Sequence, residues 1–326
     1  MLEAKPSVLI LMATYQGERF VEEQIESFAA QQHQCWALLI ADDGSDDRTL
    51  ERIRAAMAMP ALRTHHWSLL KGPRQGAAAN FMFLLSEANR RIAAGESDAQ
   101  YIALADQDDI WLPTKLSSAL SDMHQIDRSR AALWCSAVHF WNGQASRHSQ
   151  SRSLSPGKPL GFGNALVQNM IRGNTLMLNR AALDLLTQTE TNLPLVMHDW
   201  WCYLLMSACG ARIFYSDQPS VLYRQHPGNV IGAASGWSDR AKRLSFMLRG
   251  GFANWNRVHL MRLNEVMRRH PSVFGPEAVE QFLIFERMLH AQSAIERLQL
   301  LKRGGFYRQT RAENLSLRAA LVLGKF

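Results

Sequence analysis

The first third of the chain alternates apolar runs of strand length with segments whose apolar residues recur at helical spacing. The strand-length runs occupy residues 7–12, 37–40 and 101–105, with a weaker run at 66–70. Between the first two runs, Val21, Ile25 and Phe28 fall on one face of a helix. An order of strand, helix, strand and helix predicts a parallel sheet.

A polar turn follows each of the three stronger runs. Thr14 and Tyr15 follow the first, the acidic turn at 42–47 follows the second, and Asp106, Asp108 and Asp109 follow the third. The carboxyl ends of parallel strands open at one edge of a sheet, where such folds bind ligands. The chain has neither G-x-G-x-x-G nor G-x-x-x-x-G-K-[ST], which argues against a dinucleotide dehydrogenase and a P-loop NTPase.

The third turn has the strongest chemical signal, because three carboxylates within four residues repel one another. Asp-x-Asp brings two carboxylates within reach of one hard cation, so a divalent metal with a phosphate-bearing ligand would explain the cluster. The alternative is a solvated acidic turn in which Asp109 caps a helix.

Composition indicates a globular protein: 326 residues, 47% apolar and 20% charged. No apolar run approaches the ~18 residues that span a bilayer, and residues 1–6 lack a signal-peptide pattern, so we expect a cytoplasmic protein. The four cysteines have no metal-ligand spacing and are expected to be reduced thiols.

The formal net charge of +7 is concentrated toward the C-terminus. Residues 233–326 contain 16 lysines and arginines against seven acidic residues. This argues against a nucleic-acid-binding body, although a basic tail could meet anionic lipid, a polyanionic substrate or RNA.

The middle of the chain predicts a helix from Thr114 to Met123, a strand at 132–141, a further helix at 200–208 and a strand at 211–215. The segment 142–163 is rich in Ser, Gly and Pro, and is either a lid over a ligand site or a surface excursion. Asp199 stands at the start of the last helix.

The ordered set of turns resembles the family 2 inverting glycosyltransferases, and the form ADQDDIW at 105–111 is similar to the branch that contains bacterial rhamnosyltransferases. The resemblance covers residues 7–232. It implies an α/β fold of the GT-A type, an open and mostly parallel sheet with helices on both faces, plus a C-terminal helical extension. The implied segments are a nucleotide-sugar-binding half (1–115), an acceptor-binding half (116–232) and the basic extension (233–326).

The resemblance assigns donor-binding roles to residues in the first half. Thr14 and Tyr15 would line the nucleotide base and ribose, and Asp43 would accept a hydrogen bond from the pyrimidine imide. Asp106 would approach the ribose or a metal-bound water. Arg74 is a further donor contact, although an arginine in a glycine-flanked loop is as often merely solvated.

The implied cofactor is Mg²⁺ or Mn²⁺. Asp108 would bind the metal that bridges the diphosphate, which offsets the charge building on the leaving group. The closing segment Tyr223-Arg224-Gln225-His226 and the residues to Gly232 resemble the family's ending, in which His226 would contact the metal or diphosphate with Arg224 beside it. The alternative for His226 is a surface histidine.

The second half would supply the acceptor site. The implied acceptor contacts are Asn169, Gly173, Asn174, His198 and Trp200. Asp199 would be the general base that accepts the proton of the attacking hydroxyl. Its alternative role is a helix cap worth ~1 kcal/mol, and His198 either orients the base, touches the acceptor or is structural.

The expected activity is metal-dependent inverting transfer, with L-rhamnose from dTDP-L-rhamnose as the leading donor and a bacterial surface glycan such as lipopolysaccharide or O-antigen as acceptor. Alternatives are a UDP-hexose or UDP-N-acetylhexosamine donor, or a non-catalytic protein that binds nucleotide or glycan. The expected partners are the dTDP- or UDP-linked donor and a saccharide acceptor, which can be lipid-linked, and no nucleic acid. The C-terminal helices would bind the inner membrane surface, pack on the catalytic domain or form a homodimer. Their predicted apolar faces are formed by Leu244, Met247 and Leu248, then Trp255, Val258, Leu263 and Met267, then Phe282, Phe285 and Leu289. The basic residues beside these faces would be solvated or would face an anionic membrane surface: Arg240, Lys242, Arg243, Arg249, Arg257, Arg262, Arg268 and Arg269.

Overall fold

The computed structural model describes residues 7–143, 151–226, 245 and 249–326. The chain forms two compact units, each discontinuous in sequence. The first, here called the sheet unit, consists of Met1–Ser155, Ile171–Gln188 and Arg212–Val230. The second, the helical unit, consists of Pro156–Met170, Thr189–Ala211 and Ile231–Phe326. The roles expected for 1–115, 116–232 and 233–326 stay predictions.

The predicted parallel strands form the first half of the sheet. In spatial order these are β3 (Trp67–Lys71), β2 (Trp36–Asp42), β1 (Val8–Thr14) and β4 (Tyr101–Ala105), and every neighbouring pair is parallel. The helices between them are α1 (Val21–Ala29), α2 (Thr49–Met57) and α3 (Ala77–Ala93). Strands β1 and β2 extend beyond their apolar runs: the last pair in their register is Thr14 with Asp42.

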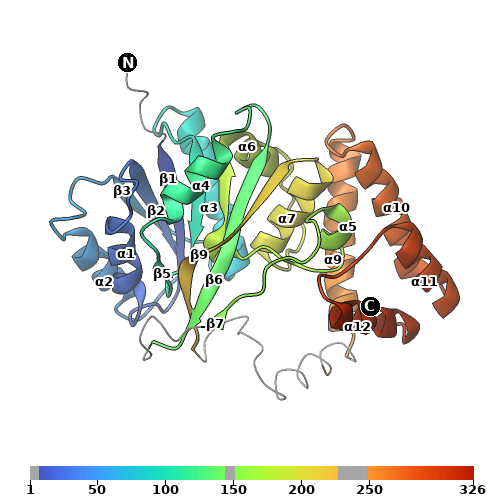
Figure 1. Ribbon diagram of the computed structural model, residues 1–326. Coiled ribbons are helices and arrows are strands. Elements are labelled where there is room, and N and C mark those ends of the chain that lie inside the picture. Colours follow the sequence, from blue (N-terminus) through green and yellow to red (C-terminus); the bar gives the residue numbers. More distant parts are fainter. Residues whose placement is uncertain (1–6, 144–150, 227–244, 246–248) are drawn as a thin grey trace. The chain divides into compact units, whose positions relative to one another are not determined.

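Beyond β4 the sheet is mixed. Strand β8 (Met177–Asn179) is antiparallel to β4 and to β6 (Ala132–Trp141). Strand β9 (Arg212–Arg224) is parallel to β6, and Figure 1 shows the two side by side. The remaining elements are β5 (Ile110–Trp111), β7 (Ser151–Arg152), α4 (Lys115–Met123), the 3₁₀ turn η1 (Gly173–Thr175) and α6 (Arg180–Gln188). The segments expected as a strand near 211–215 and a closing stretch after it are one continuous strand.

Both faces of the parallel strands are covered. Val8, Ile10 and Met12 on β1 belong to one apolar cluster with residues of α1, α2 and α4, and the intervening Leu9 and Leu11 are also buried. Because successive side chains of a strand point to opposite faces, a strand buried at every position needs helices on both sides. This explains the continuous apolar runs and confirms the predicted α/β class.

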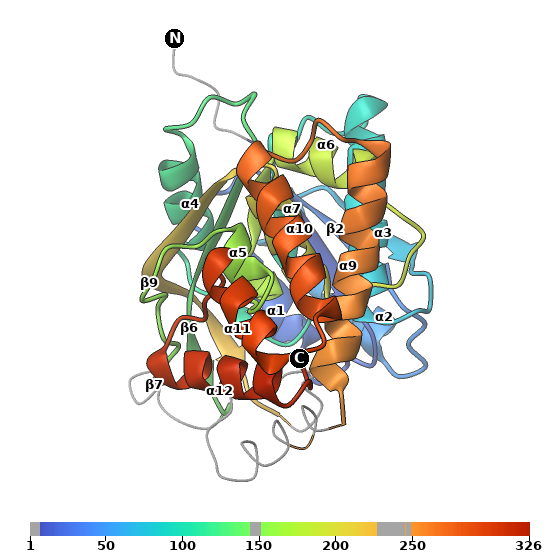
Figure 2. The same cartoon turned by 90° about the vertical axis from the view of Figure 1, so that its right-hand side faces the viewer.

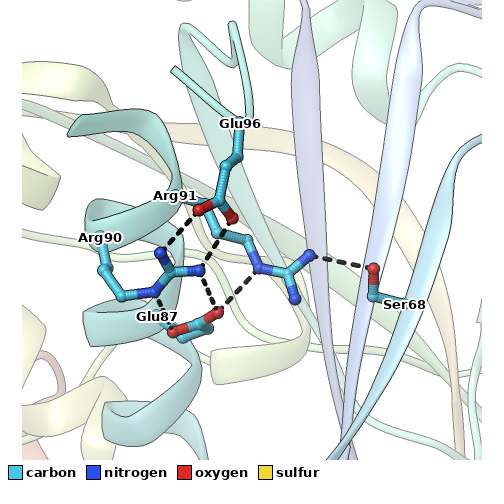
Figure 3. Close-up of polar contacts among 5 residues, drawn as sticks. All are labelled: Ser68, Glu87, Arg90, Arg91 and Glu96. Atoms are coloured by element: carbon cyan, nitrogen blue, oxygen red, sulfur yellow. Dashed lines mark hydrogen bonds and ion pairs between the residues drawn. The ribbon is translucent and has the colours of Figure 1, made fainter. Parts of the chain in front are cut away.

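An ion-pair cluster fastens α3 to the adjacent strand β3. Figure 3 shows Arg90 bridging Glu87 and Glu96, with nitrogen–oxygen distances of 2.8–2.9 Å. Arg91 donates from Nε to Glu87 Oε1 at 2.8 Å and from Nη1 to Ser68 Oγ on β3 at 2.9 Å. The hydrogen bonds from Arg90 and then Arg91 lower the pKa of Glu87 to about 2.

The helical unit contains α5 (Phe162–Ala165), α7 (His198–Ala208), α9 (Gly251–Arg269), α10 (Pro276–His290), α11 (Ala294–Arg303) and α12 (Arg311–Val322). Figure 2 shows α10, α11 and α12 following one another in orange to red. The predicted apolar positions Leu263, Phe282 and Phe285 are fully buried. The predicted face at Leu244, Met247 and Leu248, and the basic positions Arg240, Lys242 and Arg243, lie outside the described residues.

One predicted solvated arginine of the C-terminal helices is instead buried. Arg262 on α9 is 1% exposed, donates to Leu193 O at 2.6 Å and Glu190 Oε1 at 2.9 Å, and lies 4.6 Å over the Trp201 ring. The expectation that Arg262 faces solvent or a membrane is therefore wrong. A carboxylate, a carbonyl and an aromatic face replace its hydration.

Among the described residues, no helix combines the length and hydropathy that a membrane crossing requires.

Candidate active site

The turns after β1, β2 and β4 lie at one edge of the sheet. Thr14 Oγ1 donates to Asp42 Oδ2 at 2.9 Å, and the Asp43 amide donates to the Thr14 carbonyl at 2.8 Å. The Asp42 carboxylate also accepts from the Gly44 and Ser45 amides and the Ser45 hydroxyl. Asp42 therefore stabilises its own turn and leaves the neighbouring Asp43 as the donor-binding candidate.

Gln107, between Asp106 and Asp108 of the third turn, fixes the first turn. Its Oε1 accepts from the Tyr15 amide at 2.9 Å, and its Nε2 donates to the Tyr15 carbonyl at 2.8 Å. The Tyr15 side chain is 55% exposed and is free to stack on a planar base. A Cβ added at Gly17 would collide with the end of the Gln107 side chain, so a larger residue there would displace the amide that holds Tyr15. Sequence reasoning missed Gln107; its signal was an amide held between two acids.

Asp43 is held by the loop that follows β3. Its two carboxylate oxygens accept from the Arg74 amide at 2.6 Å and the Gly76 amide at 2.7 Å, and the residue is 7% exposed. Each oxygen has a second lone pair that could accept an imide N–H. Arg74 has a left-handed φ of 59°, and its side chain lies where a Cβ at Gly44 would be 2.8 Å from Arg74 Nε. The loop after β3 thus brings Arg74 next to Asp43, the other predicted donor residue of this pair.

The acidic turn after β4 forms a compact carboxylate cluster. Asp106, Asp108 and Asp109 each offer an oxygen, and these atoms lie within 4.8 Å of one another. Asp108 Oδ2 is 2.7 Å from His226 Nε2, which brings together the two residues predicted as metal ligands. Asp106 and Asp108 are partly exposed, whereas Asp109 is fully buried.

Asp109 has a structural role in the cluster, because both of its oxygens are hydrogen-bonded within the protein. Its oxygens accept from Asn174 Nδ2 at 2.5 Å and the Arg224 amide at 3.0 Å. Burial, and then the charge of Asp108, raises the pKa of Asp109 to about 7. The alternative in which Asp109 caps a helix is wrong, because β5 begins at Ile110.

The remaining donor set fits a divalent cation. Asp106 and Asp108 supply carboxylate oxygens, and His226 supplies a ring nitrogen beside them. Oxygen ligands suit Mg²⁺ and Mn²⁺, and imidazole is accepted more readily by the transition metal.

Arg224 positions this cluster. Its Nε donates to the Asp108 carbonyl at 2.8 Å and its Nη2 to Glu23 Oε2 at 2.9 Å. The guanidinium lies 4.7 Å from the Phe20 ring centroid and 4.4 Å from that of Trp141. With its side chain only 8% exposed, Arg224 holds the acidic turn against α1 and β6.

A buried lysine, which was not predicted from the sequence, contacts the cluster through Asn174. Lys115 is 1% exposed, donates to the Asn174 carbonyl at 2.5 Å and lies 3.3 Å over the Trp111 ring. Burial lowers the pKa of Lys115 well below its usual value. Asn174 and the buried Gly173 belong to η1. Asn174 accepts from Lys115 and donates to Asp109, so it links these two side chains. The acceptor contacts expected of Gly173 and Asn174 stay predictions.

The helical unit contains the predicted base. Asp199 is the second residue of α7, and its Oδ1 accepts from the Trp200 amide at 2.6 Å. The N-cap is Met197, so the cap role considered for Asp199 is wrong, although a carboxylate in the first turn still favours the helix dipole. Burial lowers the pKa of the neighbouring His198.

Trp200 and Asn169 also lie in the helical unit. Trp200 is 5% exposed, donates from Nε1 to the Ala165 carbonyl at 2.7 Å and packs 4.6 Å from the His259 ring. The sheet unit thus brings together the predicted donor and metal residues, while Asn169, His198, Asp199 and Trp200 belong to the other unit. The acceptor and base roles stay predictions.

The sequence model for Glycosyl transferase family 2 matches residues 9–184, more than half of the chain. This chain therefore belongs to glycosyl transferase family 2, as its turns indicated. A relative, the dTDP-rhamnosyl transferase RfbG of Shigella flexneri, is 26% identical over 246 residues, which are 72% of this chain and 78% of that protein.

Solved glycosyltransferase structures share the fold. The mannosyltransferase PcManGT from Pyrobaculum calidifontis, in complex with GDP-Man and Mn²⁺, matches with a TM-score of 0.53 and 17% identity over 98% of this chain and 81% of that one. S. aureus TarS 1–349 in complex with UDP-GlcNAc matches with a TM-score of 0.51 and 16% identity over 97% and 90%. The predicted GT-A fold is confirmed.

Proposed function

We propose that this protein is a metal-dependent inverting glycosyltransferase that moves L-rhamnose from dTDP-L-rhamnose onto a saccharide acceptor of a bacterial surface glycan. The observation that carries the proposal is the contact between Asp108 and His226 at the sheet edge that also holds Tyr15 and Asp43. The likeness to a dTDP-rhamnosyl transferase supports the choice of sugar.

The donor would be held by its base, ribose and diphosphate. The exposed Tyr15 ring would stack on the base, Thr14 would lie beside it, and Asp43 would accept the imide N–H. Asp106 would approach the ribose, and Arg74 would add a positive charge near the nucleotide.

A divalent ion held by Asp108 and His226 would supply positive charge to the diphosphate leaving group. The metal-binding residues would therefore favour departure of the nucleotide, and no second catalytic acid is needed there. This separates the proposed reaction from a glycosidase, in which two carboxyl groups flank the bond.

Asp199 would act at the other substrate. In an inverting transfer the acceptor hydroxyl attacks from the face opposite the leaving group, and a carboxylate accepts its proton as the bond forms. We assign that step to Asp199, with His198, Asn169, Gly173, Asn174 and Trp200 as the proposed acceptor set.

The second candidate uses a UDP-linked hexose or N-acetylhexosamine. Uracil and thymine present the same imide to Asp43, so the base contact alone does not separate dTDP from UDP. TarS, a solved structure of similar fold, is in complex with a donor of this class, UDP-GlcNAc.

A panel of nucleotide sugars tests the proposal. The purified protein should show Mn²⁺-dependent hydrolysis and thermal stabilisation with dTDP-L-rhamnose, more than with UDP-glucose, UDP-GlcNAc or GDP-mannose. Stabilisation by a UDP sugar alone would transfer the assignment to the second candidate. Binding without hydrolysis or transfer to any saccharide acceptor would favour a non-catalytic nucleotide-binding protein.

A further inference from the structure

A groove of about 810 Å³ lies on the C-terminal helices, within the helical unit. Its apolar lining comes from Leu298 and Leu301 on α11, Phe306 in the following connection and Leu315 on α12. The volume falls in the ~300–1,000 Å³ range of small-molecule sites. It is built entirely from residues that the proposed sugar-transfer chemistry leaves unused.

Four cations surround this apolar lining. They are Lys158, Lys302, Arg311 and Arg318, and all four are exposed. Among the described residues that line the groove, none is acidic. Within the same described ranges, none of the four cations forms an ion pair with a carboxylate. This contrasts with Arg268 and Arg287 nearby in sequence, which pair with Glu265 and Glu296.

The parts of the groove are fixed relative to one another. The Lys158 amide donates to Gln309 Oε1 at 2.8 Å, which ties the Lys158 segment to the connection before α12. Thr310 and Glu313 form a capping box at the start of α12. The capping box already satisfies amides at that helix end, so the attraction for an anion comes from the side-chain cations.

The stripe on α12 continues the groove outward. Arg311, Leu315, Arg318 and Val322 recur at intervals of four, three and four residues, so they share one helical face. Leu315 is 69% exposed, Val322 49% and Leu323 57%. A free inorganic anion would satisfy the cations and leave these apolar side chains in water, whereas an anionic amphiphile satisfies both.

We propose that the groove between α11 and α12 binds a membrane lipid through its phosphate headgroup, with Leu298 and Leu315 against the adjoining acyl or prenyl carbons. The four cations supply charge complementarity and the apolar lining selects a lipid over a soluble phosphate. This goes beyond the proposed sugar transfer, because it gives the chain a docking site for the anionic membrane surface that would present a lipid-linked acceptor. The proposal also narrows the expectation that the basic segment 233–326 binds anionic lipid to a defined set of residues.

The test is flotation of the full-length protein with vesicles of phosphatidylcholine alone or mixed with phosphatidylglycerol. The wild-type protein should float with the anionic vesicles at low salt and less at high salt. The double variant Arg311→Gln, Arg318→Gln should bind them about 10- to 30-fold more weakly, because each basic residue near the surface contributes severalfold. Leu315→Gln, at an exposed position that should not disturb folding, should bind at least threefold more weakly.

The matched control is Arg249→Gln with Arg257→Gln, which removes the same charge from two exposed positions, one just before α9 and one on it, that also form no ion pair with a carboxylate among the described residues. It should lower binding less than threefold. Equal losses in the two double variants would overturn the site in favour of general charge attraction. Equal flotation with neutral vesicles would overturn the headgroup assignment.

Two further outcomes would also contradict the proposal. Release of the protein from vesicles by glycerol 3-phosphate at constant ionic strength would make the groove a site for soluble phosphate. A dimer in light scattering that Leu315→Gln dissociates, with unchanged flotation, would make the occupant a second copy of the chain. Because flotation needs no sugar donor, its failure leaves the proposed transfer reaction untouched.

Discussion

Asp199 illustrates how one side chain can be assigned two roles that different measurements separate. Asp199 lies in the first turn of α7, after the N-cap Met197. There its negative charge favours the helix dipole, and its carboxylate accepts a hydrogen bond from the Trp200 amide. Asparagine can retain the hydrogen bond and loses the charge, so it is a nearly isosteric probe. A proton acceptor, by contrast, must be a carboxylate.

We expect Asp199→Asn to lower the turnover number at least a hundredfold, because the amide cannot take the hydroxyl proton. The loss of charge at the helix start should cost only about 0.3–1 kcal/mol of stability. Steady-state kinetics with the donor identified by the nucleotide-sugar panel, alongside thermal unfolding, checks both effects. Near-normal turnover would reduce Asp199 to its local role in the helix.

Some contacts of single residues could not be predicted from the sequence. Gln107 and Tyr15 are 92 positions apart, and their paired hydrogen bonds depend on the order in which β1 and β4 lie in the sheet. Lys115 has the sequence context of an exposed helix start, yet it is buried against Trp111. Local spacing contains no information on such distant partners.

Among elements, the strands and their terminal turns were the most predictable part of the chain. A strand buried on both faces must be apolar throughout, so β1, β2 and β4 are visible as continuous runs. Their shared direction then placed the turns at one edge before any contact was known. The helical period likewise found the buried side of α10 at Phe282 and Phe285.

Helix α9 shows where the same reasoning fails. Its buried side includes Asn256, His259 and Arg262 together with Leu263. A polar residue on a helix is normally assigned to solvent, and contacts with residues far earlier in the chain, Glu190, Leu193 and Trp201, make Arg262 an interior group. Hydrophobic periodicity therefore predicted helix α9 but not the polar residues on its buried face.

The cluster between α3 and β3 gives an element-level prediction with a defined pH window. Its hydrogen bonds lower the pKa of Glu87 from 4.5 to about 2, so the ionised folded state is favoured above the unfolded pKa. The stability contributed by Glu87 is fully present above about pH 4.5 and is lost as pH falls toward 2. Solvent screening keeps the effect modest.

Glu87→Gln should lower the unfolding temperature at pH 7 by about 1–3 °C, and the difference from wild type should vanish as pH falls toward 2. Circular dichroism melts across pH provide the measurement. Glu51→Gln is the control, since Glu51 forms an exposed ion pair with Arg48 and should change the melt less. A difference that persists at pH 2 would show that ionisation of Glu87 is not its cause.

Across the described residues, the proposed functional groups are divided between the two units. The sheet unit gathers the nucleotide-side candidates Tyr15, Asp43, Asp108 and His226, and membership of glycosyl transferase family 2 is carried largely by this unit. The helical unit contains Asp199 and the cationic groove on α11 and α12. Donor binding, proton acceptance and membrane docking can therefore be tested by variants that do not share residues.

The central claim is that the Asp108 and His226 pair binds a divalent metal together with a nucleoside diphosphate. Calorimetric titration of dTDP into the wild-type protein and into Asp108→Asn, with Mn²⁺ or with a chelator, tests it most directly. Asparagine can keep the hydrogen bond to His226 while removing the charge that a metal ligand needs, and Asp46→Asn removes an exposed acid at the same sheet edge as a control.

We expect Mn²⁺ to tighten dTDP binding at least tenfold in the wild type and in Asp46→Asn, and this gain to disappear in Asp108→Asn. Retention of the full metal-dependent gain in Asp108→Asn, or equal dTDP affinity with Mn²⁺ and with chelator in the wild type, would contradict the account.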